Sequence, residues 1–96
     1  MVKPDFEWDE NKNILSFQKH GVSFKLAQLA FADIRRIIAK DLTHSKSEER
    51  FYCFGKVNSE IITVRFTFRN KIIRIIGAGY WRKGKQIYEK ENKIHR

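Results

Sequence analysis

Three arginines in and after one predicted strand are the residues best suited to bind the phosphates of a nucleic acid. Arg65 and Arg69 belong to the alternating segment 60–69, and Arg74 follows in an apolar segment. Because side chains alternate between the two faces of a strand, Arg65 and Arg69 share a face, about 13 Å apart, and reach different phosphates. Arg74 can approach Arg69 across a tight turn at Asn70. Arg69 and Arg74 are therefore the predicted phosphate-stabilising pair.

Cleavage of an RNA chain by its own 2′-hydroxyl also needs groups that transfer protons. A base accepts the hydroxyl proton, cations stabilise the crowded phosphate and an acid protonates the leaving oxygen. Histidine side chains titrate near neutrality, so His44 is a candidate base or acid, and Glu49 is a second candidate base. Each has a structural alternative, because His44 can cap its loop and Glu49 can pair with Arg50 or Arg74. His20 is expected mainly to stabilise the end of a helix.

Further residues are predicted to hold the RNA outside the reacting phosphate. Arg65 is expected to contact a neighbouring phosphate, although it can equally be a solvated surface charge or part of an ion pair. Trp81 stands in a basic segment and can stack on a base, with Arg82 and Lys83 as cations beside it. Tyr88 is a candidate to contact RNA or donate a proton, or else to pack the last helix against the sheet.

The charge balance points to a polyanionic partner. Twenty Lys and Arg against eleven Asp and Glu give a formal net charge of +9, and the pI is near 9.9. Such a chain attracts nucleic acid or an acidic protein before any specific contact forms. The alternative is a basic protein without a polyanionic ligand. A hydrophobic content of 42% with 14% aromatic residues favours a folded domain over a disordered basic tail.

The cysteine and histidine content predicts chemistry without a metal or other cofactor. Cys53 is the only cysteine, so neither an internal disulfide nor a cysteine metal cluster can form. The histidines lack the spacings typical of zinc sites. The charged N-terminal segment does not resemble a signal peptide, and no segment approaches the length of a membrane span. We therefore expect a cytoplasmic protein without membrane contact.

The periodicity predicts one α+β domain over residues 1–96. Asp9 can cap a helix that ends at Gly21, and Ser23 can cap a second helix. Strands are expected over 35–42, 51–57 and 60–69 and from Lys71, and a C-terminal helix from about Gly84. A short extended stretch at 5–8 can add an edge strand. The expected architecture is two N-terminal helices, an antiparallel sheet of about four strands and one C-terminal helix, with the helices packed on one face of the sheet.

Five motifs, in this order along the chain, resemble those of the BrnT toxins. They are Phe6-Glu7-Trp8-Asp9; Lys19 to Phe24; His44-Ser45 with Glu48 to Phe51; Thr67 with Arg69; and Arg74-Ile75-Ile76. BrnT toxins are a branch of the RelE-like ribonuclease toxins of bacterial type II toxin-antitoxin systems. The resemblance implies a RelE-like fold, metal-independent RNA cleavage that inhibits translation, and a tight complex with a BrnA-like antitoxin. It also implies that RNA is bound directly, free or on the ribosome, and operator DNA only through the antitoxin.

One segment departs from the family pattern. The family usually continues with Ser-Ala-Arg, whereas this chain has Gly77-Ala78-Gly79, so the expected arginine at position 79 is missing. Arg82 or Lys83 can place a cation in the same space. The departure leaves a second hypothesis open: a weakened or inactive module that binds nucleic acid and antitoxin and acts in regulation of its own operon.

Overall fold

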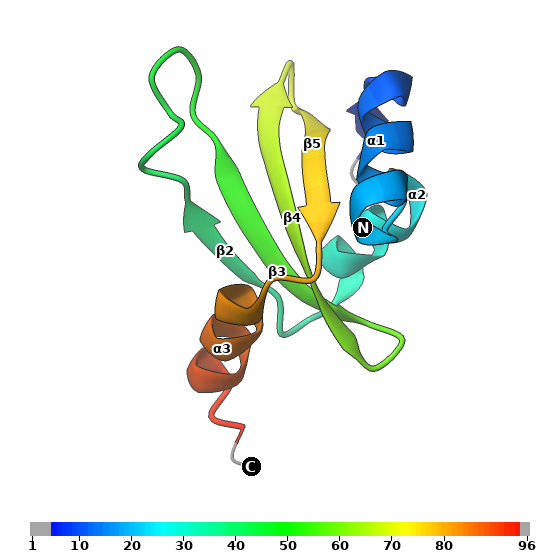
Figure 1. Ribbon diagram of the computed structural model, residues 1–96. Helices are drawn as coiled ribbons and strands as arrows, with labels where there is room; N and C mark the ends of the chain where they lie inside the picture. The colour runs from blue at the N-terminus through cyan, green and yellow to red at the C-terminus, as the bar shows by residue number, and fades with distance from the viewer. Residues whose placement is uncertain (1–4, 95–96) are drawn as a thin grey trace.

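The computed structural model describes residues 5–94, which form a five-stranded mixed sheet with helices on both sides (Figure 1). The strand order is β1-β5-β4-β3-β2. The strands are β1 (Phe6–Trp8), β2 (Ile37–Lys40), β3 (Phe51–Val57), β4 (Glu60–Arg69) and β5 (Ile72–Gly79). The helices are α1 (Glu10–His20), the short α2 (Phe24–Ala27), the 3-10 helix η1 (Gln28–Ala32) and α3 (Arg82–Glu91).

The sheet corrects the prediction of about four antiparallel strands. The stretch Phe6–Trp8 forms the edge strand β1 and pairs with β5 in parallel, while the other three pairings are antiparallel. The edge strand that the sequence allowed at 5–8 is thus confirmed, but its parallel pairing was not predicted, because its partner lies more than sixty residues further along the chain. The general α+β class is confirmed.

The sheet contains two hairpins, with tight turns at Asn58 and at Asn70, where a turn was predicted. Asn58 and Ser59 have φ values of 49° and 72°, and Asn70 and Lys71 have 51° and 66°. Two successive residues with positive φ make the turn that matches the twist of the flanking strands. The second turn brings β5 back beside β4, and the pairing with β1 on its other side makes the apolar β5 an inner strand.

One face of the sheet packs on α2 and η1 and forms the hydrophobic core. Val64 and Phe66 of β4 and Cys53 of β3 point to this face and are buried. Gly55 also faces this side, where the backbone of η1 crosses so closely that a β-carbon would lie 2.8 Å from the carbonyl carbon and Cα of Ala30. The absence of a side chain at position 55 is therefore what lets η1 pack directly on the sheet.

The opposite face carries α3, which corrects the prediction that all helices pack on one face. Gly84 of α3 lies against Thr63 and Phe54, and a β-carbon there would be 2.8 Å from Cδ1 of Phe54. Because Phe54 and Gly55 are neighbours in one strand, their side chains point to opposite faces. Helix α3 therefore covers part of the face that α2 and η1 leave open, as Figure 1 shows. It begins at Arg82, slightly earlier than predicted.

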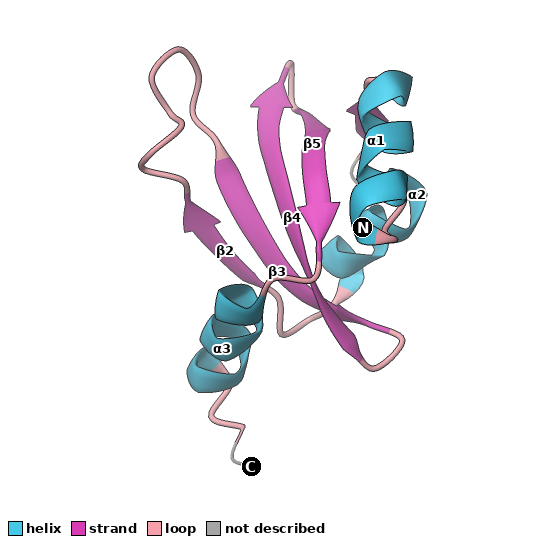
Figure 2. Ribbon diagram, viewed as in Figure 1, coloured by secondary structure: helices cyan, strands magenta, loops and turns pink. Residues whose placement is uncertain are grey.

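Helix α1 lies beside β5, at the side of the sheet whose edge strand is β1 (Figure 2). The side chain of Asp9 accepts a hydrogen bond from the Asn11 amide at the start of this helix, and Gly21 ends it with φ of 72°, both as predicted. The Ser16 hydroxyl donates to the carbonyl oxygens of Val22 and Ala78, each at 3.0 Å. These bonds hold α1 beside the last residues of β5, where one side of the helix borders the face of the sheet that carries α3.

Candidate functional site

A cavity of about 490 Å³ opens on the face of the sheet that carries α3, between α1 and the segment that leads into α3. We call it the sheet cavity. Helix α1 supplies one wall, strands β3, β4 and β5 supply the floor, and Tyr80 and Trp81 close the side next to α3. Its polar lining residues are Lys12, Ser16, Lys19, His20, Tyr52, Thr63, Arg65 and Tyr80.

A β-bulge in β5 directs two glycines to the floor of this cavity. Arg65 pairs with Gly77 whereas Phe66 pairs with Ile75, so Ile76 is an extra residue in β5. The extra residue changes the alternation and puts Gly77 on the same face as Arg65. Gly79, two residues further on, then shares that face.

Each glycine makes room for one side chain. A β-carbon at position 77 would lie 3.2 Å from Nη2 of Arg65, so the guanidinium lies directly over Gly77. A β-carbon at position 79 would lie 3.4 Å from Cγ of His20, so the imidazole lies over Gly79. The arginine expected at position 79 from the BrnT resemblance would enter the space that the His20 ring occupies in this chain.

Arg65 is a cation with no carboxylate beside it. Within residues 5–94 no ion pair involves Arg65, whereas Arg50, Arg69 and Arg74 all have a glutamate within 4 Å. Lys12 and Lys19 line the same cavity from α1. An unpaired guanidinium in a concave, positively charged site is well placed to bind an anion with two parallel hydrogen bonds.

An aromatic wall borders Arg65 on the β3 side. Tyr52 is the cross-strand partner of Arg65, and its ring lies 5.6 Å from that of Trp81 and 5.8 Å from that of Phe54. Burial, followed by the negative charge of Asp41, raises the pKa of Tyr52, and the charge of Arg65 partly opposes this rise. Tyr52 is therefore a protonated phenol at neutral pH. Trp81 remains 42% exposed, which leaves part of its ring available to a base.

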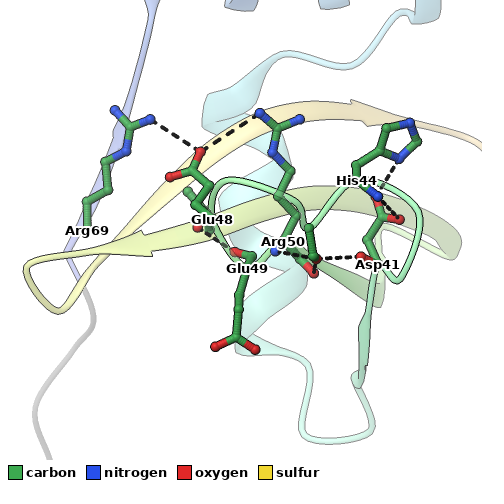
Figure 3. A network of polar contacts seen from close by, with 8 residues as sticks. Asp41, His44, Glu48, Glu49, Arg50 and Arg69 are labelled. Carbon is green, nitrogen blue, oxygen red and sulfur yellow. Dashed lines mark hydrogen bonds and ion pairs between the residues drawn. The ribbon is translucent and has the colours of Figure 1, made fainter.

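Arg69 and Arg74 lie on the same sheet face but are each held by a glutamate. In the register of β4 and β5 they are diagonal neighbours, a placement that puts their Cα atoms about 7–8 Å apart. Nη2 of Arg69 lies 3.4 Å from Oε1 of Glu48, which is also near Arg50 (Figure 3). Nη1 of Arg74 donates to Oε2 of Glu7 at 2.8 Å. The two predicted phosphate ligands are thus close together and both have carboxylate partners.

His44 and Glu49 lie on the loop between β2 and β3, outside the sheet cavity. Nδ1 of His44 is 2.9 Å from Oδ2 of Asp41, and the two are drawn together in Figure 3. Burial opposes ionisation of Asp41, but hydrogen bonds from the side chain and amide of His44 lower its pKa. Glu49 pairs with Lys40 at 2.9 Å. His44 is thus held within its own loop, and Glu49 pairs with Lys40 and not with Arg50 or Arg74, the partners named from the sequence.

The three predicted RNA-binding residues of α3 have different surroundings. Arg82 and Lys83 are exposed, and Arg82 lines a second cavity on the outer side of Trp81. Tyr88 is 1% exposed, and its hydroxyl donates to Oδ2 of Asp33 at 2.6 Å. Burial and this hydrogen bond raise the pKa of Tyr88 to about 12. Tyr88 thus packs α3 against the rest of the fold, the structural alternative named from the sequence.

His20, Tyr52, Lys12 and Lys19 are the cavity residues that sequence reasoning missed. His20 was assigned only to the end of α1, which it does occupy. The signal that was available lies in β5, where Gly77 and Gly79 are two residues apart and so leave one strand face without side chains. A side-chain-free strip on a strand indicates the close approach of another group.

Residues 5–94 contain no cluster of side chains suited to hold a metal ion. No group of three or more His, Cys, Asp and Glu side chains is clustered there. Cys53 is buried in the core, and burial raises the pKa of its thiol to about 12, so it stays protonated. No helix in this part of the chain is long and apolar enough to cross a membrane.

Comparison with known proteins gives one family match. Residues 8–84 match the family model described as the ribonuclease toxin BrnT of type II toxin-antitoxin systems. The matched range includes every residue that lines the sheet cavity. No curated protein matches the chain.

Proposed function

The chain belongs to the BrnT family of ribonuclease toxins of type II toxin-antitoxin systems, and from this premise we propose that it cleaves RNA in the sheet cavity. In this proposal the reaction needs no metal ion, inhibits translation in the cytoplasm and stops when a DNA-binding, BrnA-like antitoxin binds the toxin. Operator DNA is contacted through the antitoxin alone.

The single observation that carries the proposal is the unpaired guanidinium of Arg65 on the floor of the cavity. A phosphodiester under attack by the neighbouring 2′-hydroxyl gains negative charge, which a positively charged hydrogen-bond donor held beside it stabilises. Arg65 has no carboxylate partner among the described residues, so it can bind the phosphate without first breaking an ion pair. Arg69 and Arg74 would each have to release a glutamate first.

The surroundings of Arg65 fit an RNA strand. Lys12 and Lys19 can contact the phosphates on either side of the scissile one, and the exposed part of Trp81 offers a surface on which a base can stack. The net charge of +9 attracts the polyanion from solution. Arg82 and Lys83 at the start of α3 extend this positive surface beyond Trp81.

The experiment that tests the proposal combines expression with cleavage by the purified chain. Expressed alone, the chain should arrest growth and break cellular RNA, and co-expression of its antitoxin should restore growth. The purified toxin should cleave single-stranded RNA equally well in buffer with EDTA, because arginine and lysine supply the positive charge that a metal would provide. An oligonucleotide of the same sequence with deoxyribose at every position should remain intact, because it lacks the attacking 2′-hydroxyl.

Two outcomes would contradict the proposal in different ways. Loss of cleavage in EDTA that returns with a divalent cation would show that a metal takes part. Harmless accumulation of a chain that still binds RNA and antitoxin would favour the second hypothesis, a non-cleaving module, for which Gly79 in place of the family arginine is the supporting observation.

A further inference from the structure

We propose that His20 is the base that accepts the 2′-hydroxyl proton during RNA cleavage. This inference rests on the proposed function and adds to it the group that starts the reaction. His20 is the last residue of α1 and its ring enters the sheet cavity over Gly79. His20 belongs to α1 and Arg65 to β4, and the fold brings both side chains to the floor of the sheet cavity.

The spacing of the two glycines fits one phosphodiester between Arg65 and His20. Gly77 and Gly79 are two residues apart on the same strand, so the groups that lie over them are separated by about 7 Å. A phosphate that accepts a charge-assisted hydrogen bond of about 2.8 Å from Arg65 would fill most of that gap. Its ribose 2′-hydroxyl would then lie near the imidazole.

The other titratable side chains of the cavity are poor proton acceptors. They are Lys12, Lys19, Tyr52, Arg65 and Tyr80. Lysine, arginine and tyrosine side chains are ordinarily protonated at neutral pH, and the pKa of Tyr52 is raised further by burial and by Asp41. Among the described residues that line the cavity there is no Asp, Glu or Cys. An imidazole is the one lining group that ordinarily accepts a proton near neutrality.

The proposed cleavage needs only His20, the RNA and solvent water for its proton transfers. The neutral imidazole of His20 takes the proton from the 2′-hydroxyl, and the 2′ oxygen forms a bond to phosphorus. The bond from phosphorus to the 5′ oxygen breaks, and this leaving oxygen takes a proton from solvent water in the open cavity. The products are a 2′,3′-cyclic phosphate and a 5′-hydroxyl, and the imidazolium returns its proton to solvent.

The test replaces His20 by alanine and by glutamine in the full-length toxin. Loss of a general base should lower the rate of RNA cleavage about 100- to 10,000-fold, with RNA affinity and melting temperature unchanged because the side chain is exposed. Free imidazole should restore cleavage to His20→Ala, whose missing ring leaves space over Gly79. It should not restore His20→Gln, whose side chain fills that space. Gln18→Ala, an exposed change on the same helix that does not line the cavity, is the matched control.

The outcomes separate this inference from the proposed function. If wild type cleaves RNA and both His20 variants cleave as fast, His20 is not the base, while cleavage in the cavity still stands. A large loss in His20→Ala without rescue by imidazole would also overturn the inference, because it would indicate a structural role. Absence of cleavage by the wild type would overturn the inference and the proposed function together.

Discussion

Replacement of Arg65 by alanine should lower the rate of RNA cleavage about 100- to 1,000-fold, the usual cost of removing one preorganised donor to a transition-state anion. The reason is that Arg65 supplies the one guanidinium in the sheet cavity, and within residues 5–94 no carboxylate competes for it. The measurement is single-turnover cleavage of a labelled RNA by purified toxin. Arg65→Lys should recover only part of the rate, because an ammonium cannot donate two parallel hydrogen bonds.

The matched controls for Arg65 are Arg69→Ala and Arg74→Ala. Both arginines lie on the same sheet face and carry the same charge, but each has a glutamate partner. We expect each substitution to lower the rate less than about 10-fold, mainly through weaker attraction of RNA. The contrary pattern, a silent Arg65→Ala beside a large loss in either control, would place the scissile phosphate at Arg69 and Arg74, the pair first predicted from the sequence.

A second large effect is expected in the fold itself. Gly55→Ala should lower the free energy of unfolding by about 3 kcal/mol, the upper end of the usual cost of overpacking. The new methyl group would meet the Ala30 backbone, whose carbonyl carbon and Cα would both be 2.8 Å away, and a backbone cannot turn aside as a side chain can. Urea unfolding followed by circular dichroism measures the change.

Gly77→Ala is the control for this prediction. There the methyl group would meet the end of the flexible Arg65 side chain at 3.2 Å, so the expected loss of stability is below about 1 kcal/mol. Equal stabilities of the two variants would mean that η1 does not rest on β3 as closely as described. The comparison therefore tests the packing of the helical layer on the sheet independently of any activity.

The parts of the fold that follow local rules could be predicted from the sequence. Asp9 and Gly21 mark the ends of α1 because capping depends on residues within a single turn. Asn58 and Asn70 mark the two hairpins because positive φ is a property of the turn residues themselves. Strand β4 was located closely because alternation extends over its ten residues, and β3 because an apolar, aromatic-rich run ends at the turn residues Asn58 and Ser59.

Features set by distant parts of the chain could not be predicted. The parallel pairing of β1 depends on where β5 lies, and the face covered by α3 depends on the fit of Gly84 against Thr63 and Phe54. The β-bulge at Ile76 follows from the relative register of two strands. Each of these is decided by packing, for which no short sequence pattern exists.

The sequence predicted which face of the sheet carries the candidate site better than it predicted which residues form the site. Arginines on one strand face were read correctly from alternation, but their partners were not visible. Arg74 is held by Glu7, sixty-seven positions earlier in the sequence, and Arg69 by Glu48. An arginine's readiness to bind phosphate depends on such partners. His20 and Gly79 likewise meet only because α1 packs beside the end of β5.

The most direct test of the central claim is to observe which arginine binds the RNA phosphate. Side-chain Nε signals of the ¹⁵N-labelled toxin can be followed by NMR while a 2′-O-methyl RNA, which cannot be cleaved through its 2′ oxygen, is added. We predict that the Arg65 signal shifts at saturation, while the signals of Arg69 and Arg74 keep their positions because their glutamates remain bound. Large shifts at Arg69 and Arg74 with an unchanged Arg65 would contradict cleavage in the sheet cavity.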